Sequence, residues 1–139
     1  MKSKKIISML KHILLLVILL LSLKSIAFQE AKNQQIAATF KSGNAKELAK
    51  HFGKTVDLSV LDKEKVYSKA QAELIIKDFF SKHNPTGFKV IHQGASKAGM
   101  RYGIGELQTV KGNFRVSFYT KKNSAGSVVI QQLRIDTND

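Results

Sequence analysis

The 139-residue chain contains no cysteine and no tryptophan, and it has a single proline. Without cysteine it can form no disulfide bond and no thiolate metal site, and it has no cysteine nucleophile. Acidic residues are also scarce, ten against 23 lysines and arginines, so the formal net charge is +13. Since 43% of the residues are apolar, the chain has the composition of a folded domain, and its length predicts one domain.

The N-terminus combines positive charge with an apolar run. Four lysines in the first eleven residues precede residues 13–23, which are apolar except for Ser22. A spanning helix needs about 20 apolar residues, so this shorter run predicts a secretory signal peptide. Small residues at Ser25 and Ala27 predict cleavage after Ala27, which divides the chain into a signal peptide (1–27) and a mature domain (28–139). An uncleaved N-terminal anchor is the alternative that the pattern leaves open.

Cleavage of a signal peptide would lower the net positive charge of the domain. Cleavage removes five lysines and no acid, which lowers the net charge from +13 to +8. We expect export across the inner membrane to the periplasm or the medium, with membrane contact only through the signal segment before cleavage. The remaining lysines are dispersed, so we expect no nucleic-acid binding. Attraction to an anionic glycan or lipid is a further alternative.

Helical patterns occupy the first half of the mature domain. Residues 30–41 contain good helix formers and end before Gly43, and Asn44 has capping-box spacing for a second short helix that Gly53 ends. A strand over 55–61 and a return over 64–67 follow. Ser68 then caps the clearest helix, which Pro85 terminates. The apolar stripe of this helix consists of Ala72, Ile75, Ile76, Phe79 and Phe80.

Beyond Gly87 the hydrophobic period changes to two. The alternation predicts strands over 88–95, 100–110, 113–121 and 127–136, and their short connections predict an antiparallel meander. Helices that precede a sheet in this way indicate an α+β fold, with helices packed on one face of a curved, mainly antiparallel sheet.

Two glycines lie two positions apart in one predicted strand, Gly103 and Gly105. Both leave the same strand face without a side chain, so we expect a sharp bend or a close backbone approach there. Such a bend would curve the sheet into a cone with a concave inner surface. Two tolerated glycines in an exposed strand are the alternative.

Six short stretches carry a family resemblance: YSKAQA at 67–72, DFF at 78–80, Phe88 with His92 and Gly94, YGIGEL at 102–107, GNFRV at 112–116 and QLRI at 132–135. In these stretches the chain resembles the exported bacterial family called domain of unknown function 4783, a branch of the nuclear transport factor 2-like superfamily with a cystatin-like cone. The resemblance implies this architecture and an exported setting typical of Bacteroidota. It implies no activity, because the superfamily contains both enzymes and binding or dimerisation modules.

Enzymes of that superfamily place a carboxylate or histidine opposite tyrosine hydroxyls in a pocket. The residues of these types in this chain are Asp57, Tyr67, His92 and Tyr102. Alternation along one strand predicts that His92 faces the cavity together with Phe88. A histidine among apolar neighbours is more often a packed residue than a base, and no local motif matches those enzymes.

Neither a metal site nor a cofactor is predicted. The histidines His51, His83 and His92 lack the i, i+4 spacing that places two imidazoles on one helix face. The glycines at 103 and 105 lie inside an alternating strand and not at the start of a helix, so they do not form a phosphate-binding loop.

The sequence therefore predicts an exported, non-catalytic domain that binds a small apolar ligand or a protein partner. The predicted pocket residues are Phe79, Phe80, Phe88, His92 and Tyr102. A partly apolar outer sheet face predicts a homodimer. The alternative function is a lyase or isomerase in which His92 is the base and Tyr102 or Tyr67 polarises the substrate.

Overall fold

The structure is a computed structural model. It describes residues 1–96 and 98–138, with the backbone alone described at residues 25, 26 and 29. The chain separates into two compact units, Met1–Gln34 and Gln35–Asp139. The helices are α1 (Lys2–Ser42), α2 (Ala45–Ala49) and α3 (Lys69–Lys82). The strands are β1 (Phe52–Val60), β2 (Lys63–Ser68), β3 (Pro85–Ala95), β4 (Arg101–Thr109), β5 (Gly112–Lys122) and β6 (Val128–Thr137).

The first unit consists of the N-terminal part of α1. Its segment Lys2–Lys24 has 23 residues and is long and apolar enough to cross a membrane, a property that signal sequences share. The predicted helix over 30–41 is confirmed, but it forms the end of α1 and not a separate element. Cleavage after Ala27 remains a prediction: the site falls within α1, and the side chains at 25 and 26 of the motif lie outside the described residues.

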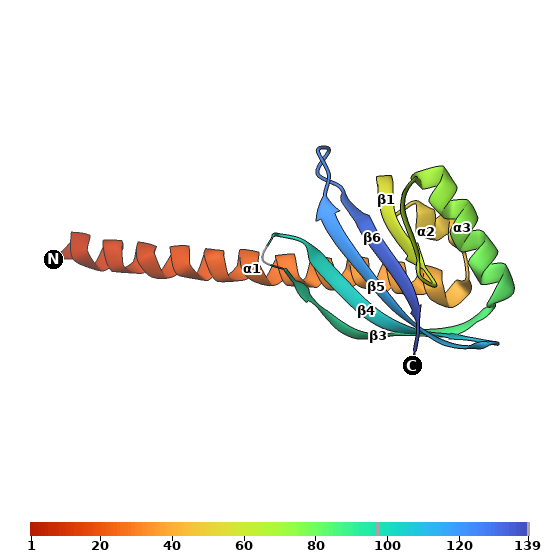
Figure 1. Cartoon of the computed structure of the whole chain (residues 1–139). Coiled ribbons are helices and arrows are strands. Elements are labelled where there is room, and N and C mark those ends of the chain that lie inside the picture. Colours follow the sequence, from red (N-terminus) through yellow and green to blue (C-terminus); the bar gives the residue numbers. More distant parts are fainter. Residues whose placement is uncertain (97, 139) are drawn as a thin grey trace. The chain divides into compact units, whose positions relative to one another are not determined.

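The second unit contains one six-stranded sheet in the order β2-β1-β6-β5-β4-β3. All neighbouring strands are antiparallel except β1 and β6, which are parallel. Figure 1 shows the sheet curving, with α2 and α3 together on one side of it. The α+β prediction and the antiparallel meander over β3–β6 are confirmed.

The core lies between the helices and one sheet face, here called the inner face. It contains Phe40 at the end of α1, Leu48 of α2 and Ile76 of α3, all fully buried. The sheet contributes the inner-face residues Val56, Leu58, Leu107, Phe114, Val116, Phe118, Leu133 and Ile135. The opposite face, here called the outer face, carries Tyr102, Ile104, Glu106, Arg115, Ser117, Tyr119, Gln132, Arg134 and Asp136.

Local chemistry accounts for the helix ends. Gly43 ends α1 with φ of +64°, which glycine adopts without a Cβ clash. The Asn44 side chain accepts a hydrogen bond from the Glu47 backbone N–H at 3.0 Å, as predicted. The Glu47 carboxylate does not complete a capping box, because it bonds to Lys50 instead. The prediction that Gly53 ends α2 is wrong, because α2 ends at Ala49. Gly53 instead lies in β1, which pairs with β6.

The hairpin and helix at the centre of the unit match the predicted pattern closely. β1 and β2 are joined through Leu61 and Asp62, which have φ of +49° and +67°, so the turn lies one residue earlier than predicted. Ser68 and Gln71 form the capping box of α3. β3 begins at Pro85, three residues before the predicted start, because an edge strand tolerates a residue without an N–H at its first position.

Candidate functional site

An open groove of about 450 Å³ lies between α3 and the β1–β2 hairpin. Its apolar lining consists of Leu58, Val60, Leu61, Tyr67, Leu74, Ile75 and Phe79. Its polar lining consists of Lys63, Asp78, Lys82 and His83. Apolar walls with a few polar groups at the edge are typical of a site that binds a small molecule.

Three elements build the groove. Alternation along β1 turns Leu58 and Val60 toward α3. On β2, Lys63, the partner of Val60, and Tyr67, the partner of Val56, extend the wall. From the other side, the helical period places Ile75 and Phe79 on one face of α3. Leu74, beside that face, is 66% exposed. The groove is therefore the unfilled continuation of the core toward the sheet edge at β2.

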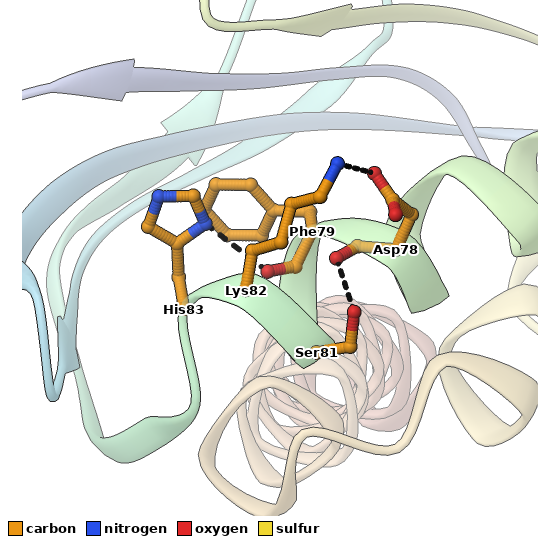
Figure 2. A network of polar contacts seen from close by, with 5 residues as sticks. All are labelled: Asp78, Phe79, Ser81, Lys82 and His83. Carbon is orange, nitrogen blue, oxygen red and sulfur yellow. Dashed lines mark hydrogen bonds and ion pairs between the residues drawn. The ribbon is translucent and has the colours of Figure 1, made fainter.

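Polar contacts hold the C-terminal end of α3 in place, as Figure 2 shows. The Lys82 ammonium donates to the Asp78 carboxylate at 2.8 Å, and the Ser81 hydroxyl donates to the Asp78 carbonyl oxygen at 2.7 Å. Both partners of the ion pair are mostly exposed, with 63% and 61% of their side chains accessible. Such a pair adds little stability, but it engages Oδ2 of the carboxylate at this rim.

His83 closes the groove at the end of α3. Its Nδ1 lies 3.1 Å from the Phe79 carbonyl oxygen. Because a carbonyl oxygen can only accept, Nδ1 carries the proton in this contact. The imidazole stacks on the Phe79 ring with centroids 4.5 Å apart and meets the Phe114 ring edge-on at 5.0 Å. His83 is thus fixed by packing and a backbone contact, as a structural histidine is.

A bulge in β3 changes the predicted position of His92. Val90 pairs with Gly105 but His92 pairs with Ile104, so Ile91 is an extra residue on β3. Directly paired residues lie on the same sheet face, and Ile104 belongs to the outer face. The expectation that His92 shares a face with Phe88 is therefore wrong, because the bulge reverses the alternation between them.

The glycine pair has the predicted cause in part, with a contribution from aromatic rings that was not predicted. A Cβ at Gly103 would overlap the Phe118 ring, and a Cβ at Gly105 would overlap the Phe88 ring. At Gly105 a backbone atom also approaches, the Lys89 carbonyl oxygen, 2.9 Å from the Cβ position, so the predicted close backbone approach is confirmed there. Both glycines in addition make room for phenylalanine rings. These rings fill part of the space in which a pocket was expected: Phe88 stacks on Phe40 with ring centroids 5.0 Å apart.

The five residues predicted to line one pocket lie in three places. Phe79 lines the groove. Phe80 and Phe88 pack against the Phe40 ring in the core. His92 and Tyr102 lie on the outer face, where the Tyr102 ring lies 6.1 Å from that of Tyr119.

The enzyme interpretation required His92 and a tyrosine inside one pocket. Of the predicted tyrosines, Tyr67 lines the groove, while His92 lies exposed on the outer face. Asp57 also lies on the outer face, paired with Gln132. Among the described residues no three histidine or acidic side chains gather as a metal ion would require.

Of the eleven groove residues, the sequence predicted Phe79 as a pocket residue and Tyr67 as a candidate polarising residue. It missed the other nine, among them Leu61, Leu74 and His83. One signal was present: Leu74 lies off the apolar stripe of its own helix, and Leu61 lies in a turn. A leucine outside the core pattern indicates either an ordinary surface residue or a contact site. Choosing between them requires knowing that the turn of the hairpin comes to lie beside α3.

Comparison with known proteins places the chain in a family. The sequence profile of the domain of unknown function DUF4783 matches residues 33–136. The chain belongs to the DUF4783 family. A DUF4783 protein of Bacteroides uniformis is 39% identical, with a TM-score of 0.71 over 76% of this chain and 96% of that chain. One of Bacteroides ovatus is 34% identical, with a TM-score of 0.70 over 76% of this chain and 94% of that chain.

More distant structures share the DUF4783 fold alone. An NTF-2 like protein of unknown function from Silicibacter pomeroyi is 13% identical, with a TM-score of 0.58 over 82% of this chain and 98% of that chain. The resemblance to DUF4783 and to the nuclear transport factor 2-like architecture is confirmed. Among curated proteins, none matches the chain.

Proposed function

We propose that the chain is an exported, non-catalytic domain whose groove between α3 and the β1–β2 hairpin binds a small apolar molecule. The supporting observation is the groove itself: its volume of about 450 Å³ falls within the range of ligand pockets. Seven of its eleven lining residues are apolar or aromatic. An occupant would cover leucine side chains that the protein leaves exposed.

The polar groups of the groove are held in place at its rim. Asp78 is paired with Lys82, and Nδ1 of His83 faces a backbone carbonyl oxygen. Each group keeps an acceptor, the second Asp78 oxygen and Nε2 of His83. We propose binding without catalysis because His92, the base of the enzyme alternative, and Tyr102 lie outside the groove. The rim groups orient an occupant, while the apolar walls supply the affinity.

Titration with Nile red, an uncharged apolar dye, tests the groove. Leu74→Ser removes an exposed wall residue, so we expect the dissociation constant to rise about tenfold, since burying one leucine contributes about 1.5–3 kcal/mol. The matched control is Val110→Ser, because Val110 is 64% exposed against 66% for Leu74 and lies outside the groove. Equal weakening in both variants, or no saturable binding to the parent protein, would contradict the proposal.

We propose export by a cleaved signal peptide. The apolar helix with its flanking lysines supports this, as does family membership shared with Bacteroides proteins. Amino-terminal sequencing of protein recovered from the periplasm should begin at Phe28. Recovery of the intact chain from the membrane fraction would instead establish a retained anchor.

We also propose a homodimer through the outer face. This face combines the half-buried Tyr102, Ile104 and Tyr119 with charges of both signs, Glu106 and Arg115 among them. A two-fold interface must be self-complementary, and a surface that carries an aromatic centre with both signs of charge meets that requirement.

A further inference from the structure

A second hollow, of about 550 Å³, lies where β1 starts beside β6. It is lined by Lys50, Phe52, Gly53, Lys54, Lys69, Asn123, Ser127 and Val129, and is here called the basic hollow. It shares no lining residue with the groove. Three of its eight lining residues are lysines and none is acidic.

The strand pairing brings these residues together from distant parts of the sequence. Phe52 pairs with Ile130, and the Ile130 N–H donates to the His51 carbonyl oxygen at 2.7 Å, which sets the start of β1 beside β6. On the other side, Thr55 pairs with Ser68. The ladder ends at this pair. The next residues are Lys54 of β1 and Lys69, the first residue of α3, and both line the hollow.

The charges of the basic hollow are not balanced within the described residues. Lys50 is paired with Glu47, with 2.6 Å between Nζ and Oε1, and this hydrogen bond lowers the pKa of the Glu47 carboxyl. Lys54 and Lys69 have no carboxylate partner in the part of the chain that the structure describes. Like charges that line one hollow repel each other. An anion between them would turn this repulsion into attraction.

Neutral hydrogen-bond donors complete the lining. The Asn123 Oδ1 accepts from the backbone N–H groups of Ala125 and Ser127 at 3.0 and 2.9 Å, which fixes the β5–β6 connection against the hollow. Its oxygen being engaged, Asn123 can offer its amide N–H groups to a ligand, and Ser127 can offer its hydroxyl. Gly53 also lines the hollow, and a Cβ there would lie 3.5 Å from the side chain of Val129, another lining residue.

We propose that the basic hollow binds a compact multivalent anion of the phosphate class. Its three lysines, reduced by the single charge of Glu47, leave a surplus of two positive charges, which matches a phosphate dianion better than a carboxylate. Lysine is an established phosphate ligand that acts as a point charge with three rotatable N–H donors. This site is independent of the groove and of the apolar ligand proposed for it.

Titration with sodium pyrophosphate at about 0.15 M NaCl, followed by amide NMR shifts, tests the site at an ionic strength that screens diffuse attraction. The full chain is expressed with its own N-terminal segment, and the protein is purified whether or not the expression host has cleaved that segment. We expect saturable shifts around residues 50–54 and 123–129. Lys54→Gln with Lys69→Gln should raise the dissociation constant roughly tenfold or more. The matched control, Lys89→Gln with Lys111→Gln, removes the same charge from exposed sites outside the hollow and should change it less than about twofold.

A second arm identifies the source of the phosphate. The protein is sedimented with vesicles of phosphatidylcholine and phosphatidylglycerol. Co-sedimentation that is lost only in the Lys54/Lys69 variant would support a lipid headgroup as the ligand. Binding of pyrophosphate without co-sedimentation would support a soluble phosphate. Equal weakening in both double variants, or no saturable binding in either arm, would overturn the proposal. Thermal unfolding of all variants verifies that each is folded.

Discussion

The Phe88 ring occupies the space that a side chain at Gly105 would need. Phe88 in turn stacks on Phe40, which is fully buried at the end of α1. Because Gly105 has no Cβ, the Phe88 ring of the edge strand β3 can reach the Phe40 ring at the end of α1. Close packing of this kind makes the site intolerant of even one added carbon.

We expect Gly105→Ala to lower the free energy of unfolding by about 1–3 kcal/mol, because the added Cβ overpacks the core against a ring that cannot retreat. Combining it with Phe88→Leu should cost less than the sum of the two single changes, because the smaller side chain makes room. Urea denaturation measures both. Gly87→Ala is the control, since its Cβ would meet only the end of the flexible Gln108 side chain, at 2.6 Å from Oε1. Equal losses for the two alanines, or strict additivity, would contradict this account.

At the same scale, sequence reasoning was accurate for caps and inaccurate for His92. Asn44 and Ser68 cap their helices as predicted, because a cap depends on residues three positions apart. The position of His92 depends on a bulge that inserts Ile91, and no residue type near it signals that insertion. Pairing with β4 decides it, and such pairing is a long-range property.

Helix α3 connects the core with the groove, so its stability bears on both. Its buried side, with Ile76 and Phe80, faces the sheet, while Leu74 and Asp78 line the groove. The helix begins with a capping box in which the Gln71 N–H donates to the Ser68 hydroxyl at 3.3 Å and the Ser68 N–H donates to the Gln71 side chain at 3.2 Å. Two N–H groups of the first turn are satisfied in this way.

Ser68→Ala should therefore destabilise the domain by about 1 kcal/mol. Ser81→Ala, in the same helix, is the control: the Ser81 hydroxyl bonds to a carbonyl oxygen inside the helix, and alanine is the better helix former, so we expect no loss. Thermal unfolding compares the two variants. A larger loss at position 81 than at position 68 would contradict the role assigned to the cap.

At the scale of the whole molecule, the outer face decides whether the domain acts alone. Its central residues Ile104 and Tyr119 are only half-buried in one chain. Ile104→Lys should convert the proposed dimer to a monomer, because two copies of the new charge would meet near the two-fold axis. Size-exclusion chromatography with light scattering measures the mass. The control Val110→Lys adds the same charge at an exposed turn and should leave the dimer intact; a monomeric parent protein would end the proposal.

The sequence by itself determined the elements and their order. Helices over 69–82 and strands over 101–109 and 112–122 follow from periods of 3.6 and 2 and from turn residues, which act over a few positions. The α+β class follows from that order. Short motifs in the chain were likewise enough to indicate DUF4783, whose sequence profile matches residues 33–136.

Only the tertiary structure decided where the side chains meet. The groove requires the hairpin turn at Leu61 to lie beside Leu74 on α3, and the basic hollow requires β1 to run parallel to β6. The bulge at Ile91 sends His92 to the outer face, away from Phe88. Local patterns state which side of an element is apolar, but contacts between distant elements depend on pairing register and on how aromatic rings fill the core, and these are properties of the assembled fold.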